Sequence, residues 1–249
     1  MDHTPPPFFN RGPAPLVRLA FFASLSLALL VLDARFRYTE GLRSVLALAV
    51  YPLQAIASMP GALGERVSRV EGGTTTHFHY DHIGNFDMFP AATFHLQDKE
   101  MAFATGRHML DPKFGASMNV DDVVGMVRHV YGKRARFHDG DTELAPGLSL
   151  HHIGGHTAGM QSVRVMTKRG WVMVASDAAH LYANMETRNP FPVIFELEKV
   201  FAGYDRLKEL AASPDHVVPG HDPLVLRRYP AVSKELDGVA VRLDEAPKK

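Results

Sequence analysis

His77-Phe78-His79-Tyr80-Asp81-His82 is the stretch that decides the fold of this chain, because it packs three imidazoles and one carboxylate into six residues. On an extended segment alternate side chains point the same way, so His77 and His79 can reach one metal ion. Asp81 and His82 follow where the chain turns into a helix, and they can reach a second ion. Imidazole nitrogen and carboxylate oxygen are ligands that zinc accepts. The stretch therefore predicts a site for two metal ions, and a histidine-rich surface turn is the alternative.

Three more candidate ligands stand alone later in the chain, each just after a short apolar run: His156, Asp177 and His221. Such positions place a side chain in a loop past the end of a strand, where loops carry function on a rigid scaffold. Two ions roughly 3.5–4 Å apart can share a water, lower its pKa and polarise a carbonyl group. The whole set therefore favours a hydrolytic reaction.

From about residue 74 to the C-terminus, these motifs resemble the metallo-β-lactamase superfamily. Gly-His-Thr-Ala-Gly-Met-Gln at 155–161 and Pro-Gly-His-Asp-Pro-Leu-Val at 219–225 are most similar to its N-acyl homoserine lactonase branch. The resemblance implies an α/β fold, the αβ/βα four-layer sandwich, with two Zn2+ or other divalent ions as cofactors. It implies a first ion held by His77, His79 and His156, a second held by Asp81, His82 and His221, and Asp177 between them.

The implied reaction is hydrolysis of a small-molecule lactone or ester, above all the opening of an N-acyl homoserine lactone ring in quorum quenching. Asp81 is expected to be a catalytic residue that passes a proton to the leaving alkoxide. In the lactonase branch a tyrosine commonly stands three residues after the bridging aspartate, but here that position is His180. Tyr182, two residues further on, is the second expected catalytic residue. The departure keeps open another hydrolase of the same fold, acting on a thioester, a phosphoester or a β-lactam.

Composition sets limits on the partners. The chain has 249 residues, 46% of them hydrophobic and 22% charged, which is an ordinary globular balance. The formal net charge is zero and no long run of Lys or Arg is present, so nucleic acid is not expected as a partner. Without any cysteine, disulfides and thiolate ligands are excluded.

Downstream of the metal-binding stretch, apolar periodicity predicts alternating strands and helices, which favours a layered α/β fold. Strands are expected at 92–96, 148–153, 161–166 and 171–175, and helices at 98–104, 120–131 and 197–211. The apolar face expected on the helix at 120–131 consists of Val120, Val123, Val124, Val127 and Tyr131.

The N-terminal part has a different character. Residues 1–15 are rich in proline and are expected to form an extended tail, and residues 16–70 a hydrophobic, helical segment like a membrane anchor. Residues 19–32 carry no charge, and with three preceding residues they approach the lower limit for a membrane span. We therefore expect membrane contact through residues 16–32. A secretory signal and a buried core helix are the alternatives.

The N-terminal part contains Pro-Pro-Pro-Phe-Phe at 5–9, Val-Leu-Asp-Ala-Arg-Phe-Arg-Tyr at 31–38 and Val-Tyr-Pro-Leu-Gln at 50–54. With these motifs, residues 5–69 resemble the N-terminal membrane anchor of the rod-shape-determining protein MreC, which implies a bacterial inner-membrane anchor. A buried strand should precede the metal-binding stretch, but only Thr74, Thr75 and Thr76 have strand propensity there. The chain is therefore predicted to join two unrelated pieces at about 66–74, with an incomplete first half in a hydrolase domain at 71–249. Residues 1–70 are expected to pack poorly against that domain.

This junction adds a third functional alternative, an inactive membrane-anchored chimera. The expected location is bacterial, in the inner membrane if residues 16–32 insert and otherwise in the cytoplasm.

Overall fold

The computed structural model describes residues 45–47, 72–84, 86–232, 234, 237–238 and 240–248. Its first sheet has the strand order β1-β2-β3-β4, and every neighbouring pair is parallel. The strands are β1 (Val45–Ala47), β2 (Gly72–Thr74), β3 (Thr93–Gln97) and β4 (Ala135–His138). Helical connections between β2, β3 and β4 make the parallel pairing possible, because a parallel pair needs a crossover.

The second sheet has the order β5-β6-β7-β8-β9, and it is antiparallel except for the parallel pair β8 and β9. The strands are β5 (Thr142–Ala145), β6 (Leu148–His152), β7 (Gln161–Thr167), β8 (Gly170–Ser176) and β9 (Val217–Pro219). The turn at 168–170 joins β7 directly to β8, as the Lys-Arg-Gly sequence predicts.

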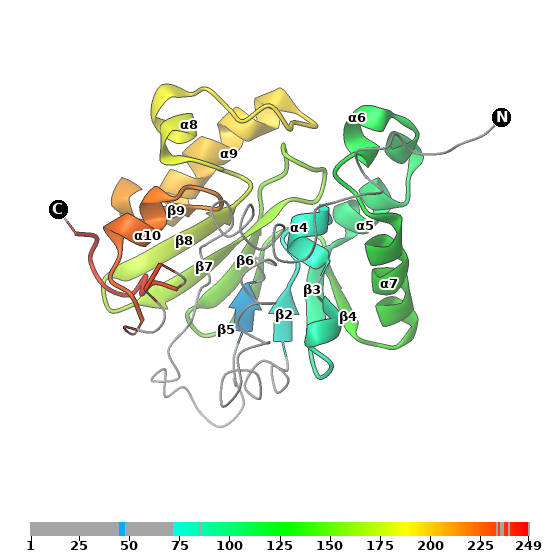
Figure 1. The fold of residues 1–249 in the computed structure, drawn as a ribbon, viewed down its shortest axis with the longest axis horizontal. Helices are drawn as coiled ribbons and strands as arrows, with labels where there is room; N and C mark the ends of the chain where they lie inside the picture. Colours follow the sequence, from blue (N-terminus) through cyan, green and yellow to red (C-terminus); the bar gives the residue numbers. More distant parts are fainter. Residues whose placement is uncertain are drawn as a thin grey trace.

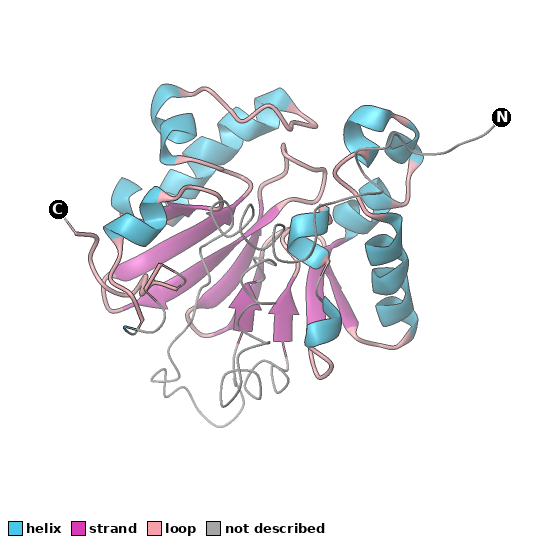
Figure 2. Cartoon of the chain, in the orientation of Figure 1, coloured by secondary structure: helices cyan, strands magenta, loops and turns pink. Residues whose placement is uncertain are grey.

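Helices flank the two sheets on opposite sides (Figures 1 and 2). Beside the first sheet lie α5 (Asp98–Ala104), α6 (Pro112–Gly115) and α7 (Val120–Tyr131). Beside the second lie α8 (Tyr182–Thr187), α9 (Leu197–Leu210) and α10 (Leu224–Arg228). The short helix α4 (Tyr80–Ile83) lies in the middle of the molecule, where the metal-binding stretch ends.

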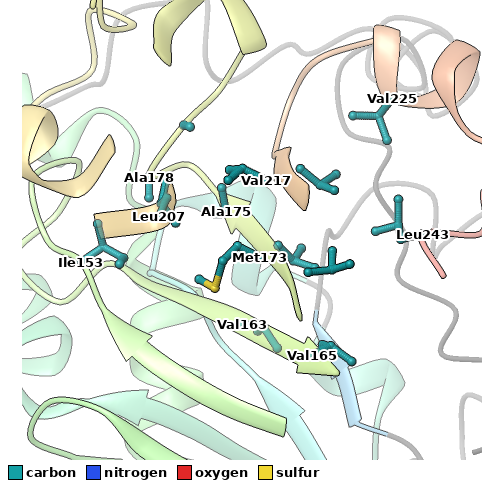
Figure 3. Packing of buried hydrophobic residues seen from close by; sticks show 14 of the residues in the cluster. Ile153, Val163, Val165, Met173, Ala175, Ala178, Leu207, Val217, Val225 and Leu243 are labelled. Atoms are coloured by element: carbon teal, nitrogen blue, oxygen red, sulfur yellow. The ribbon is translucent and has the colours of Figure 1, made fainter. Parts of the chain in front are cut away.

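Each sheet buries one apolar cluster. In the second sheet, Val163 and Met173 pack with Leu207 of α9 and Val225 of α10 (Figure 3). In the first sheet, Phe94 packs with residues of α7 and of the metal-binding stretch. The seven strands and helices expected downstream of residue 90 are confirmed to within one residue at each end, and α/β layering with them.

The buried face of α7 differs from the expected one. Val123 and Met126 are buried, but Val120 is 71% and Tyr131 86% exposed. Gly125 explains the difference, because a Cβ there would lie 2.2 Å from the ring of Phe86. The bare backbone at Gly125 therefore lets that ring pack against the helix.

The predicted helical segment at 16–70 is wrong at Val45–Ala47, which form β1 and pair with β2. The expectation of poor packing for residues 1–70 is wrong at the same place. A short apolar run fits a buried strand as well as a helix, so periodicity alone could not separate them. The rest of this segment, residues 1–15 and residues 16–32 lie outside the described part. None of the described helices is long and apolar enough to cross a membrane.

A His95→Gln variant should change the pH dependence of stability. The ring of His95 stacks on that of His138, with 2.9 Å between Nδ1 and Nε2. Burial, and the charges of His138 and Arg136, lower the pKa of His95 to about 4. In the unfolded chain the pKa of His95 is about 6.5, so protonation favours unfolding. The contribution of neutral His95 to the unfolding free energy is therefore fully present above about pH 6.5 and is lost as the pH drops toward 4. We expect the unfolding free energy, measured with urea on the metal-free proteins, to drop less between about pH 7 and about pH 5 in the variant than in the wild type. Equal losses would contradict the assignment.

Candidate metal centre

The seven predicted ligands come from four loops that meet at one edge of the two sheets. His77 and His79 lie between β2 and α4, and α4 itself carries the next two ligands. The other three follow β6, β8 and β9 in chain order, as His156, Asp177 and His221. The structure therefore brings together side chains that are up to 144 positions apart, from His77 to His221.

The first group consists of three buried histidines. Nε2 of His156 lies 3.1 Å from Nε2 of His77 and 2.9 Å from Nδ1 of His79. Burial lowers the pKa of all three, to about 4 for His79. The three imidazoles are therefore neutral near pH 7 and can offer lone pairs to a cation.

The second group consists of Asp81, His82 and His221. Oδ2 of Asp81 lies 3.4 Å from Nε2 of His82 and 3.7 Å from Nε2 of His221. Burial would lower the pKa of His82, but the carboxylates of Asp177 and Asp81 outweigh it and raise the pKa to about 10. Burial would also raise the pKa of Asp81, but His82 outweighs it and lowers the pKa to about 2. Asp81 is therefore negatively charged near pH 7 and pairs with a protonated His82.

Asp177 stands between the two groups and gives one oxygen to each. Its Oδ1 lies 2.9 Å from Nε2 of His221 and 3.1 Å from Nε2 of His82. Its Oδ2 lies 3.4 Å from Nε2 of His156 and 3.9 Å from Nε2 of His77. This is the arrangement that a carboxylate bridging two cations requires.

The hydrogen bond of His156 and the surroundings of His82 are suited to a bound cation. Nδ1 of His156 lies 2.8 Å from the carbonyl oxygen of Val193, so this nitrogen holds the ring's single proton. Its Nε2 is then an acceptor, although it faces two further ring nitrogens. Nε2 of His82 is buried and faces the carboxylates of Asp177 and Asp81, at 3.1 and 3.4 Å. Nitrogen lone pairs and carboxylate oxygens in this mixture suit a divalent metal such as zinc.

Two hydroxyls and a strained residue hold the second group in place. Oγ1 of Thr76 lies 3.2 Å from Nδ1 of His82 and 3.0 Å from Oγ of Ser176. Ser176 adopts a left-handed φ of 50° directly before Asp177. Gly220 lies against its backbone, because a Cβ there would be 2.7 Å from the carbonyl carbon of Ser176. The contacts of Thr76 and Ser176 depend on the fold and could not be predicted from the sequence. Gly220, next to His221, is the one of these residues that the sequence pattern singled out.

The structure separates His180 from Tyr182. Nε2 of His180 lies 3.0 Å from Oδ2 of Asp177, and its ring stacks on Phe191 at 4.3 Å. Tyr182 lies in the apolar cluster of the second sheet, with the guanidinium of Arg228 4.0 Å from its ring centre. Burial raises the pKa of the Tyr182 hydroxyl. His180 also belongs, with His156 and Asp177, to a group of side chains that could hold a metal.

Known proteins share this sequence pattern over part of their length. An N-acyl homoserine lactonase from a Bacillus species is 38% identical over 86 residues, which are 34% of this chain and 34% of that protein. A probable metallo-hydrolase of Mycobacterium tuberculosis is 26% identical over 199 residues, which are 74% of this chain and 62% of that protein.

Solved structures share the fold. An N-acyl homoserine lactone hydrolase with the product N-hexanoyl-L-homoserine at its catalytic metal center aligns with a TM-score of 0.51 and 25% identity. The alignment covers 61% of this chain and 56% of that one. The chain thus spans less than two thirds of the length of each of these relatives.

The family model of the metallo-beta-lactamase superfamily matches residues 50–228. The match starts upstream of the junction predicted at 66–74, so the family pattern extends further toward the N-terminus than the resemblance from residue 74 implied. The likeness of residues 5–69 to an MreC anchor stays a prediction. Because the match covers more than half of the 249 residues, the chain belongs to the metallo-β-lactamase superfamily.

Proposed function

We propose that this protein is a metal-dependent hydrolase that opens lactone rings, with N-acyl homoserine lactones as the leading substrates. The observation that carries the proposal is Asp177, whose two oxygens face two separate groups of ligands. The lactonase named among its relatives supports the choice of substrate. Lactone opening also suits the site, because the leaving group is an alkoxide to which the Asp81 carboxyl could pass a proton.

The proposed ligand sets are the two groups described above, with Asp177 shared. When bound, two divalent ions would supply an activated water and a polarised carbonyl group. Asp81 is proposed to take up the proton of the water and pass it to the leaving alkoxide. Its side chain is 19% exposed, so it can face a substrate while the neighbouring imidazoles stay buried.

His180 is proposed to donate a hydrogen bond from Nε2 to the substrate carbonyl oxygen, in exchange for the 3.0 Å contact that this nitrogen makes here with Oδ2 of Asp177. A His180→Phe variant would keep a flat ring against Phe191 and remove the donor. Loss of one such donor typically reduces kcat about 100-fold or more, so we expect a loss of that order. The matched variant Tyr182→Phe removes only a hydroxyl that lies in the apolar cluster. If Tyr182→Phe loses the activity and His180→Phe keeps it, Tyr182 is the catalytic residue, as expected from the sequence, and the role proposed for His180 is wrong.

The function is tested by incubating the zinc-loaded protein with N-hexanoyl homoserine lactone and recording the acid released on ring opening. A thioester, a phosphodiester and a β-lactam tested in parallel separate the alternatives. Ring opening by the wild type, absent from the Asp177→Asn variant, is the expected result. Turnover of only one of the other substrates would favour the second candidate, another hydrolase of this fold. The observation that favours this candidate is His180, which stands where the lactonase branch commonly has a tyrosine. Metal binding without turnover of any substrate would contradict both candidates.

A further inference from the structure

Glu100, in the first turn of α5, is a buried carboxylate with three donors and no metal-ligating role. The residue is 1% exposed. Oε1 accepts a hydrogen bond from the backbone N–H of Phe78 at 2.8 Å. Oε2 accepts from the hydroxyl of Thr157 at 2.6 Å and from the N–H of Gly159 at 2.9 Å. A buried carboxylate keeps its place only when its oxygens are satisfied in this way.

The three donors belong to the two loops that carry the first group of histidines. Phe78 lies between His77 and His79, and Thr157 follows His156 directly. The first loop leaves β2 of the first sheet, and the second loop leaves β6 of the second sheet. A single side chain thus connects the backbones of two loops that come from different halves of the molecule.

The fit around Glu100 is close. A Cβ on Gly159 would lie 2.2 Å from the backbone nitrogen of Glu100, so only glycine lets the loop rest on the first turn of α5. All three partners donate, so the side chain must offer acceptors on both of its ends. Glutamine would turn its NH2 group toward an N–H or a hydroxyl, and at least one bond to the loops would be lost.

We propose that Glu100 is a positioning residue for the first metal ion, because it sets the spacing between the His77/His79 loop and the His156 loop. This inference rests on the proposed function only in that the same histidines bind metal. It goes beyond that function by assigning the affinity of one ion to a residue that does not touch it. Partners that orient metal ligands commonly contribute about 10–100-fold in metal affinity.

The test is titration of the metal-free full chain with Co2+, recorded by visible absorption and in competition with a chelator. A His79→Ala variant identifies which of the two binding steps belongs to the first group. In Glu100→Gln we expect that step to weaken about 10–100-fold and its absorption spectrum to change, while the other step stays within about threefold of the wild type. Thr157→Val, which removes one of the three donors, should weaken the same step by less.

Arg169→Gln is the matched control, since it also replaces a charged side chain that bonds several segments. Arg169 donates to the carbonyl oxygens of Asp215 and Leu243, at the turn before β8 and away from the metal ligands. It should lower the urea midpoint and leave both Co2+ steps unchanged. The proposal is overturned if Glu100→Gln and Thr157→Val also lose only stability, with wild-type Co2+ affinities and spectra. Should Glu100→Gln fail to fold, Thr157→Val decides by the same criterion.

These readouts do not involve a substrate. A chain that binds two Co2+ ions but opens no lactone would therefore refute the proposed function and leave the inference about Glu100 standing.

Discussion

An Asp177→Asn variant is expected to retain at most one tightly bound metal ion and to lose hydrolysis by at least about 100-fold. Each carboxylate oxygen faces a different group, with Oδ1 2.9 Å from His221 and Oδ2 3.4 Å from His156. In asparagine one oxygen becomes an NH2 group, which has no lone pair to give a metal. Residues that only orient ligands already account for about 10–100-fold in affinity, so a shared ligand should account for more. Elemental analysis after dialysis against metal-free buffer measures the number of ions.

Asp141→Asn is the control for this variant. Asp141 also holds an imidazole, with Oδ2 2.7 Å from Nδ1 of His151, but it lies outside the groups that could hold a metal. This protein should keep the wild-type metal content even if its stability falls. Two ions in Asp177→Asn, or equal losses of metal in both variants, would show that Asp177 does not bridge.

A Gly155→Ala variant is expected to lose about 2–6 kcal/mol of unfolding free energy. Gly155 has a φ of 88°, and a side chain held there costs about 1–3 kcal/mol. A Cβ would also lie 2.7 Å from the backbone nitrogen of Val200, and such overlap in a packed region costs about 1–3 kcal/mol more. Because helix α9 begins just before Val200, the clash separates this helix from the loop of His156. Urea unfolding of the metal-free protein gives the loss.

Gly140→Ala separates the two causes. Gly140 has a φ of 102°, but no atom lies within 4 Å of the position that a Cβ would take. This variant should lose only the part that comes from the backbone conformation. Equal losses in Gly140→Ala and Gly155→Ala would mean that close packing against α9 contributes nothing measurable.

The candidate metal ligands could be found from the sequence because each stands in a short local pattern. A cluster of histidines, or a histidine beside glycines after an apolar run, indicates a metal ligand without any knowledge of the contacts between distant segments. The same holds for α9, whose stripe of apolar residues buries Val200, Tyr204 and Leu207 as the 3.6-residue period requires.

Other features depend on contacts between distant segments and could not be predicted in the same way. The face of α7 follows from Phe86 docking at Gly125, and a glycine carries no weight in an apolar pattern. Val45–Ala47 form a strand because β2 offers a partner there. Glu100 reads as an ordinary acidic residue in the first turn of a helix until the fold places two loops around it.

The ligands are divided between the two sheets in a way that links folding to metal supply. The first half provides His77, His79, Asp81 and His82, and the second provides His156, Asp177 and His221. Neither half holds a complete set of candidate ligands, so bound ions would tie the halves together. Each ion adds about 1.4 kcal/mol of stability for every tenfold rise of free metal above its Kd. The lifetime of the folded chain, and with it the amount of protein a cell retains, would then follow the concentration of free metal.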